Sequence, residues 1–276
     1  MKPSRSTAAR QQRRVLNPAQ NADAQGFFNL LTGAEPLGDV ESRRPDHRER
    51  LFPPTETRSM CMAQALSADG SCRQAVDDAA VKRLIAGMTR CSTHTAAYCK
   101  ARAGLPLAMI NTLTRRTGTL IAEGLCEGGL WRGRRVLLAD GTRLGLPDTA
   151  ENQAAYPQPG TLGFPKMPLV GLRGLASGAL LDAAGGPCEG KGSNEQTLCR
   201  GLRDRLAEGD ILLGDAYYPI YFLLCVLLGC SVDGLFEQYG ARRRSTDFSL
   251  GERLGTRDHL ITWTKPKRPP WMSPEK

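Results

Sequence analysis

The chain has 276 residues, of which 41% are hydrophobic and 24% charged, as expected of a globular protein. Its net charge of +9 favours a polyanionic partner. Nucleic acid fits better than a membrane, because the longest apolar run, residues 220–230, is too short to span a bilayer and no apolar stretch follows the basic N-terminus. The nine cysteines include no C-x-x-C pair, which predicts reduced thiols in a cytoplasmic protein rather than a zinc site.

Residues 1–50 form a basic stretch with weak hydrophobic periodicity, which we predict to be poorly ordered and flexible. Its arginines gather in two clusters, Arg10, Arg13, Arg14 and Arg43, Arg44, Arg48, Arg50. Two interpretations remain open for these clusters: a solvated tail, or an arm that contacts DNA.

Residues 51–127 have the pattern of short helices separated by tight turns that contain glycine. The sequence predicts a helix opening at Pro54, a second capped by Ser71, a third over Thr95–Ala103 capped by Ser92 or Thr93, and a fourth starting at Pro106. Such a segment suits a helical DNA-binding domain, in which Lys100 and Arg102 lie on a recognition helix. The alternative is a plain helical bundle with charged outer faces.

From residue 128 onward the pattern changes to strands and helices. The expected elements are strands at 135–139, 169–176 and 178–183, a helix at 194–206, a strand at 211–214, a helix at 219–229 and a strand at 232–238. Beyond residue 240 the chain is polar and basic, and residues 259–264 alternate like a half-exposed strand. The order of three strands, helix, strand, helix and strand resembles that of the ribonuclease-H-like fold.

Two of the predicted strands end in an aspartate. Residues 135–139 lead to Asp140, and residues 211–214 lead to Asp215. If the two strands are neighbours in one sheet, their carboxylates can share a divalent cation, and hard oxygen ligands select Mg²⁺ or Mn²⁺. A cation held in this way is the minimum equipment for metal-assisted phosphodiester chemistry. Without further context, an aspartate after a strand is more usually a turn or cap residue.

Five stretches give the chain a resemblance to a known family. They are 136–142 (VLLADGT), 163–170 (GFPKMPLV), 213–218 (LGDAYY), 255–260 (GTRDHL) and 263–272 (WTKPKRPPWM). In this order and spacing, the chain resembles DDE transposases of bacterial insertion sequences, of the insertion-sequence-4 type, from about Leu51 to its last residue. The resemblance implies an α/β fold with a ribonuclease-H-like mixed sheet and helices, preceded by a small all-α DNA-binding domain.

Transposases of this family carry three acidic residues, and the resemblance assigns the first two, as catalytic residues and metal ligands, to Asp140 and Asp215. The third is a Glu in a Tyr-x-x-Arg-x-x-x-Glu motif, which neither Glu237 nor Glu275 provides. We therefore expect residues 128–276 to hold a truncated catalytic core, with the start of a β-rich insertion from about residue 240. DNA strand cleavage and strand transfer are expected to be lost or very weak, while DNA binding survives.

The resemblance also implies Mg²⁺ or Mn²⁺ as the cofactor and double-stranded DNA, both terminal repeats and target, as the partner. It implies self-association in a synaptic complex at the bacterial nucleoid. Besides Lys100 and Arg102, DNA contacts are expected from two later basic clusters, Arg242, Arg243, Arg244 and Lys265, Lys267, Arg268, unless these form a solvated loop face. Two other functions remain open: a non-catalytic DNA-binding fragment that occupies element ends, and a ribonuclease-H-like nuclease.

Overall fold

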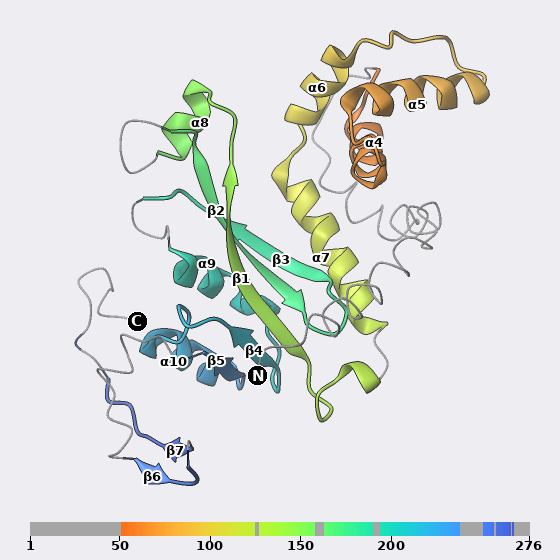
Figure 1. Cartoon of the computed structure of the whole chain (residues 1–276). Coiled ribbons are helices and arrows are strands. Elements are labelled where there is room, and N and C mark those ends of the chain that lie inside the picture. Colours follow the sequence, from red (N-terminus) through yellow and green to blue (C-terminus); the bar gives the residue numbers. More distant parts are fainter. Residues whose placement is uncertain are drawn as a thin grey trace. The chain divides into compact units, whose positions relative to one another are not determined.

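The computed structural model describes residues 51–124, 127–157, 163–189, 194–237, 251–256, 258–265 and 267 (Figure 1). The chain divides into two compact units, Met1–Leu113 and Thr114–Lys276, which are considered separately below. The predicted arm at 1–50 lies outside the described residues, and so do four of the expected DNA contacts, Arg242, Arg243, Arg244 and Arg268.

The described part of the first unit consists of helices around a small apolar core. The helices are α4 (Pro54–Leu66), α5 (Cys72–Ile85), α6 (Thr95–Ala103) and the first residues of α7 (Leu107–Glu123). The buried core contains Phe52, Met60, Ala75, Val76, Ala79 and Tyr98. The rings of Phe52 and Tyr98 meet edge to face at 6.0 Å, an arrangement that aromatic pairs prefer.

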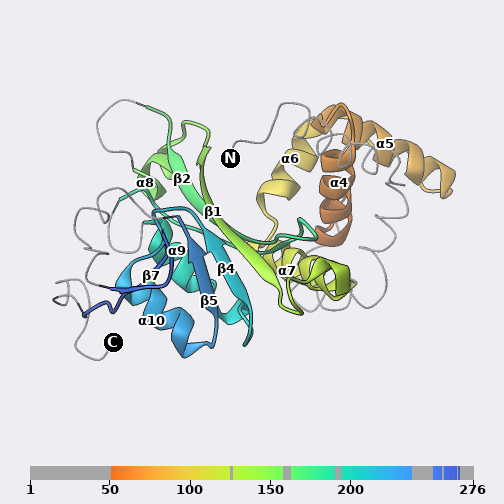
Figure 2. The same ribbon diagram turned by 60° about the horizontal axis from the view of Figure 1, so that its bottom comes forward.

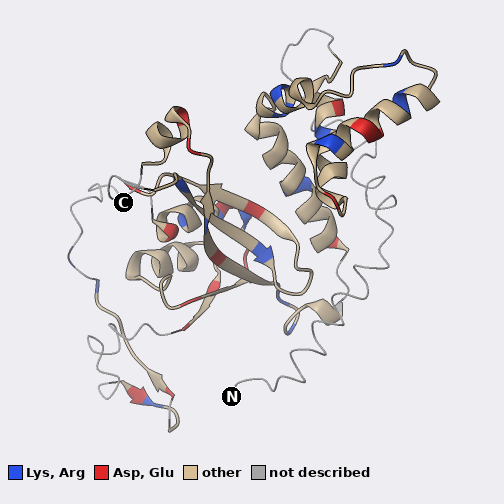
Figure 3. Cartoon of the chain, turned by 45° about the horizontal axis from the view of Figure 1, so that its top comes forward, with Lys and Arg blue, Asp and Glu red and all other residues tan. Residues whose placement is uncertain are grey.

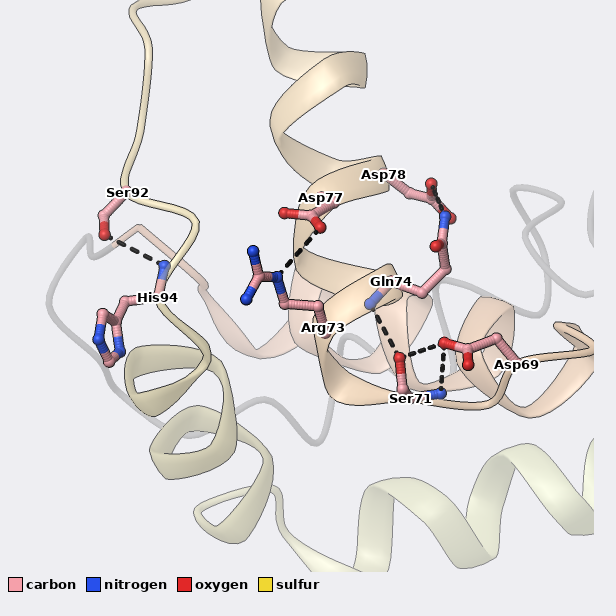
Figure 4. A network of polar contacts seen from close by, with 8 residues as sticks. All are labelled: Asp69, Ser71, Arg73, Gln74, Asp77, Asp78, Ser92 and His94. Atoms are coloured by element: carbon pink, nitrogen blue, oxygen red, sulfur yellow. Dashed lines mark hydrogen bonds and ion pairs between the residues drawn. The ribbon is translucent and has the colours of Figure 1, made fainter.

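The two cap predictions in this unit have different outcomes. Ser71 caps α5 as predicted, since its Oγ accepts a hydrogen bond from the Gln74 N–H at 3.1 Å (Figure 4). The prediction for α6 is wrong, because its N-cap position is His94, which makes no side-chain cap bond. The Ser92 hydroxyl instead accepts from the His94 N–H at 3.2 Å, in the turn before the helix.

The second unit contains a five-stranded mixed sheet with the order β3-β2-β1-β4-β5 (Figures 1 and 2). β1 pairs antiparallel with β2, and β2 pairs antiparallel with β3. β4 runs parallel to β1, and β5 runs parallel to β4. The strands are β1 (Val136–Gly145), β2 (Lys166–Gly174), β3 (Leu180–Gly185), β4 (Ile211–Gly214) and β5 (Asp233–Phe236). The fold is therefore mixed α/β.

Helices α9 and α10 pack against this sheet through its main apolar core. Leu137 and Ala139 of β1 are buried in one cluster with Leu198 of α9 and Leu223 of α10. The remaining elements of this unit are η1 (Glu127–Gly129), α8 (Ala150–Ala155), α9 (Glu195–Gly201), η2 (Arg203–Arg205), α10 (Tyr221–Gly229) and a separate hairpin of β6 (Glu252–Arg253) and β7 (His259–Leu260). None of the described helices is long and apolar enough to cross a membrane.

Several elements differ from their predicted bounds by one to three residues, as in β2, β3 and β5, and three differ more in length. β1 continues past residue 139 to Gly145, because its polar second half pairs with β2 from Val170 to Lys166. The α-helix predicted over 194–206 ends at Gly201 and is followed by the 3-10 turn η2. The strand predicted at 259–264 is formed only at its first two residues, which pair with β6.

Candidate active site

The two predicted aspartates occupy matching positions on the neighbouring parallel strands β1 and β4. Leu138 of β1 is paired with Leu213 of β4, and Asp140 and Asp215 each lie two residues further along the chain. Asp215 directly follows β4, but the prediction that Asp140 ends its strand is wrong, because β1 continues through Asp140 to Gly145 by pairing with β2. Adjacent strands lie about 4.8 Å apart, so both aspartates stand just past the paired stretch of β1 and β4. Both residues are exposed, and the Asp215 Oδ1 accepts a hydrogen bond from the Tyr217 N–H at 2.8 Å.

A third carboxylate, which the sequence prediction missed, lies close to this pair. Glu195 is the first residue of α9, directly after the N-cap Asn194, whose side chain accepts from the Thr197 N–H at 2.8 Å. Burial is the largest cause that raises the pKa of Glu195. The negative charges of Asp215 and Asp140 raise this pKa further, while Arg143 opposes them. Both aspartates are therefore within electrostatic reach of Glu195.

Gly141 provides the surface on which the Glu195 carboxyl group rests. A Cβ added at Gly141 would lie 2.7 Å from Glu195 Oε1 and nearer still to the rest of that group. Real Cβ atoms essentially never make such contacts. A side chain at position 141 would therefore push the Glu195 carboxylate away from the end of β1, and glycine leaves the space that it occupies.

One hydrogen bond connects α9 to the loop after β4, and a buried tyrosine lies in the same loop. The Gln196 Nε2 donates to the backbone oxygen of Tyr217 at 2.6 Å, which holds the start of α9 beside the turn that contains Asp215. Tyr218 is 1% exposed, and its hydroxyl has no hydrogen-bond partner among the described residues. Burial raises the pKa of this phenol, and Glu195, Cys199, Asp215 and Asp140 raise it further in that order.

The three carboxylates are not yet at the spacing of metal ligands. Within the described ranges, no group of three or more His, Cys, Asp or Glu side chains is already placed to hold a metal ion. Carboxylate oxygens are the ligands that Mg²⁺ and Mn²⁺ prefer, so the donor set fits such a cation chemically. A cation would have to draw these side chains inward from the positions they occupy.

The expected DNA contacts that the structure describes lie in both units. Lys100 and Arg102 are exposed on α6, and Arg102 also donates to Gln64 Oε1 of α4 at 3.3 Å. Lys265 and Lys267 are exposed in the C-terminal segment. In the first unit, basic and acidic positions are interspersed along the helices (Figure 3).

One signal in the sequence points to Glu195 in retrospect. Asn194 followed by Glu195 begins the predicted helix between the third and fourth strands, and Asn is a preferred N-cap residue. The pattern locates a helix start, but it does not say which end of which strand that start approaches. Comparison with protein-family models found no match to the chain, and comparison with curated proteins found none either.

Proposed function

We propose that this chain is a DDE-type transposase of the insertion-sequence-4 type, which cleaves and joins DNA strands with Mg²⁺ or Mn²⁺. The observation that carries the proposal is that Asp140 and Asp215 each lie two residues past the paired residues Leu138 and Leu213 of two neighbouring parallel strands. The sheet order β3-β2-β1-β4-β5, with three antiparallel strands followed by two parallel ones, supports a ribonuclease-H-like core. In that fold the acidic residues sit at the ends of the first and fourth strands.

In this proposal Asp140 and Asp215 are the cation ligands at the scissile phosphate. A bound divalent cation would activate the attacking hydroxyl and neutralise charge on the phosphate during in-line displacement. The contribution of the protein is positional: strand ends hold carboxylates more rigidly than loops do. The Tyr217 N–H fixes one Asp215 oxygen, which leaves the other free to act as a ligand.

The partner in this proposal is double-stranded DNA. The net charge of +9 favours association with the phosphate backbone, and the exposed Lys100, Lys265 and Lys267 are available for backbone contacts. These contacts would position the DNA without selecting a base sequence, because contacts to the phosphate backbone determine register rather than base preference.

The test is a strand-cleavage assay with the full chain, supercoiled plasmid and Mn²⁺. We expect only slow nicking, because the sequence lacks the family's third Glu motif, and we expect Asp140→Asn and Asp215→Asn each to lower its rate at least about a hundredfold, because each removes a charged ligand. Asp148→Asn is the matched control, since Asp148 is exposed. Its carboxylate accepts a hydrogen bond from Gln153 Nε2, and the side-chain oxygen of asparagine can accept the same hydrogen bond.

The products separate the proposal from its two alternatives. Joining of a labelled 3′-hydroxyl oligonucleotide to the plasmid supports a transposase, whereas nicking without joining indicates a nuclease. DNA binding that weakens with salt but produces no nicking with Mn²⁺ indicates a non-catalytic DNA-binding protein. Nicking that is unchanged in both aspartate variants would contradict the proposed site.

A further inference from the structure

Two contacts hold Glu195 beside the proposed metal ligands. The carboxyl group of Glu195 rests on Gly141, the residue directly after Asp140. Its helix neighbour Gln196 is bound to the Tyr217 backbone, two residues after Asp215. Asn194 caps the first turn of α9, which orders the segment that carries both residues. The start of α9 is therefore connected both to β1 and to the turn after β4, although Glu195 follows neither strand in the sequence.

The hydroxyl of Tyr218 is a second feature that points to a ligand here. Tyr218 is almost fully buried, and its hydroxyl has no hydrogen-bond partner in the part of the chain that the structure describes. A buried hydroxyl that is left without an acceptor is unfavourable. The charged groups that act on this hydroxyl include Glu195, Asp215 and Asp140. A carboxylate drawn inward by a cation, or water bound to that cation, would supply the missing acceptor.

The charge balance also favours a cation. Asp215 and Asp140 both act on Glu195 here, and Arg143 is the cationic side chain that acts on it. Arg143 is itself exposed to solvent, which weakens the attraction that it provides. A divalent cation would remove the mutual repulsion more completely than one solvated guanidinium group does.

We infer that Glu195 is the third carboxylate of the metal site, binding a hard divalent cation together with Asp140 and Asp215. The inference rests on the proposed function and extends it, because the sequence has no Tyr-x-x-Arg-x-x-x-Glu motif to supply a third acid. A site completed by Glu195 needs no such motif. The strand cleavage that the sequence alone predicts to be lost or very weak would then be retained.

The test is Mn²⁺ binding by the full chain, followed through the paramagnetic resonance signal of free Mn²⁺. Glu195→Gln removes the charge at nearly constant shape, and we expect the Kd for Mn²⁺ to rise at least about tenfold. We also expect the increase in Tm on adding Mn²⁺ to become smaller. Without metal, this variant should melt no lower than the parent, because the substitution relieves repulsion. A purely structural Glu195 would give a lower Tm and an unchanged affinity.

A second test moves the Glu195 carboxylate without removing it. In Gly141→Ala the new methyl group displaces the flexible end of Glu195, so we expect weaker Mn²⁺ binding with little loss of stability. Gly145→Ala is the matched control in the same strand, since a Cβ added there meets nothing within 4 Å. Circular dichroism spectra establish that each variant is folded, and Gly141→Ala keeps the test decisive should Glu195→Gln fail to fold.

The failure of this inference can be told apart from the failure of the proposed function. If Asp140→Asn and Asp215→Asn weaken Mn²⁺ binding while Glu195→Gln and Gly141→Ala bind like the parent, the two-aspartate site stands and Glu195 is no ligand. If the parent chain binds no Mn²⁺, or if the aspartate variants bind it as tightly as the parent does, both proposals are overturned.

Discussion

Position 141 shows how much of this site depends on a single small residue. Gly141 lies in β1 between Asp140, a proposed ligand, and Thr142, and only the absence of its side chain lets the Glu195 carboxyl group approach. This part of β1 therefore carries the Asp140 carboxylate and leaves space for the Glu195 carboxylate of α9. Both features concern local shape, and both are sensitive to the addition of one methyl group.

Cys199 offers a residue-scale test of how α9 packs. It is 6% exposed, and burial raises the pKa of its thiol to about 11, with Arg200 opposing the shift. The thiolate is the reactive form, so iodoacetamide at pH 8 should leave Cys199 largely unmodified in the native protein. The exposed Cys225 should react readily under the same conditions. Peptide mass spectrometry after a timed quench measures both sites.

In urea both thiols should react at similar rates, which serves as the control. Lowering the pH would protect Cys199 still further, because its folded-state pKa lies above the ordinary value and the neutral thiol is the stable form. If native Cys199 reacts as fast as Cys225, the face of α9 that carries Cys199 is not packed in the core as described. In that case the position of Glu195 on the same helix would also be in doubt.

The sequence pointed to the two aspartates as site candidates but not to the glutamate. An apolar run that ends in Asp indicates a carboxylate at the end of a buried strand; Asp215 directly follows β4 as this pattern predicts, whereas Asp140 lies inside β1. Glu195 follows no strand, and its approach to Gly141 depends on how α9 packs across the sheet. That packing combines long-range contacts from β1, β2 and α10, which no local pattern encodes.

At the scale of elements, one ion pair joins the residues that directly precede the two central strands, β1 and β4. Arg135, before β1, donates from Nε and Nη2 to the two carboxylate oxygens of Asp210, before β4, at 2.8 and 2.6 Å. Asp210 is 3% exposed and also accepts from the Ala207 N–H at 2.7 Å. The pair joins the starts of the two strands along which the proposed ligands follow, Asp140 within β1 and Asp215 directly after β4.

Arg135→Gln should destabilise the second unit by about 2 kcal/mol, because it leaves the Asp210 carboxylate buried without its cation. The value is at the low end for a buried pair, since about a third of the Arg135 side chain is exposed. Arg203→Gln is the matched control: its partner Asp204 is exposed, and the change should cost about 0.5 kcal/mol or less. Urea unfolding compares the two, and equal losses would show that the Arg135–Asp210 pair does not hold these strands.

Element positions were more predictable than element lengths. β4 begins and ends where the apolar run does, because a buried central strand has a continuous hydrophobic signal. The second half of β1 is polar and exposed, so its six residues from Asp140 to Gly145 carry no such signal and are ordered by pairing with β2. Asp210, which local pattern suggests as a turn residue, is buried because Arg135 lies beside it.

Across the whole molecule, the net charge is opposite in sign to that of the proposed site. The chain carries +9, which attracts a polyanion, whereas Asp140, Asp215 and Glu195 form a locally negative group. Such a group would repel a DNA phosphate unless a cation lay between them. Composition alone predicts the partner class, and the two aspartates predict a cation; the approach of Glu195 adds a third negative charge that strengthens the need for one.

The most direct measurement is a crystal structure of the full chain grown with Mn²⁺, with anomalous diffraction data to locate the metal. We expect an anomalous peak at the ends of β1 and β4, in coordination contact with carboxylate oxygens of both Asp140 and Asp215. Strong peaks elsewhere with none touching these two residues, under conditions in which the protein binds Mn²⁺ in solution, would contradict the proposed site.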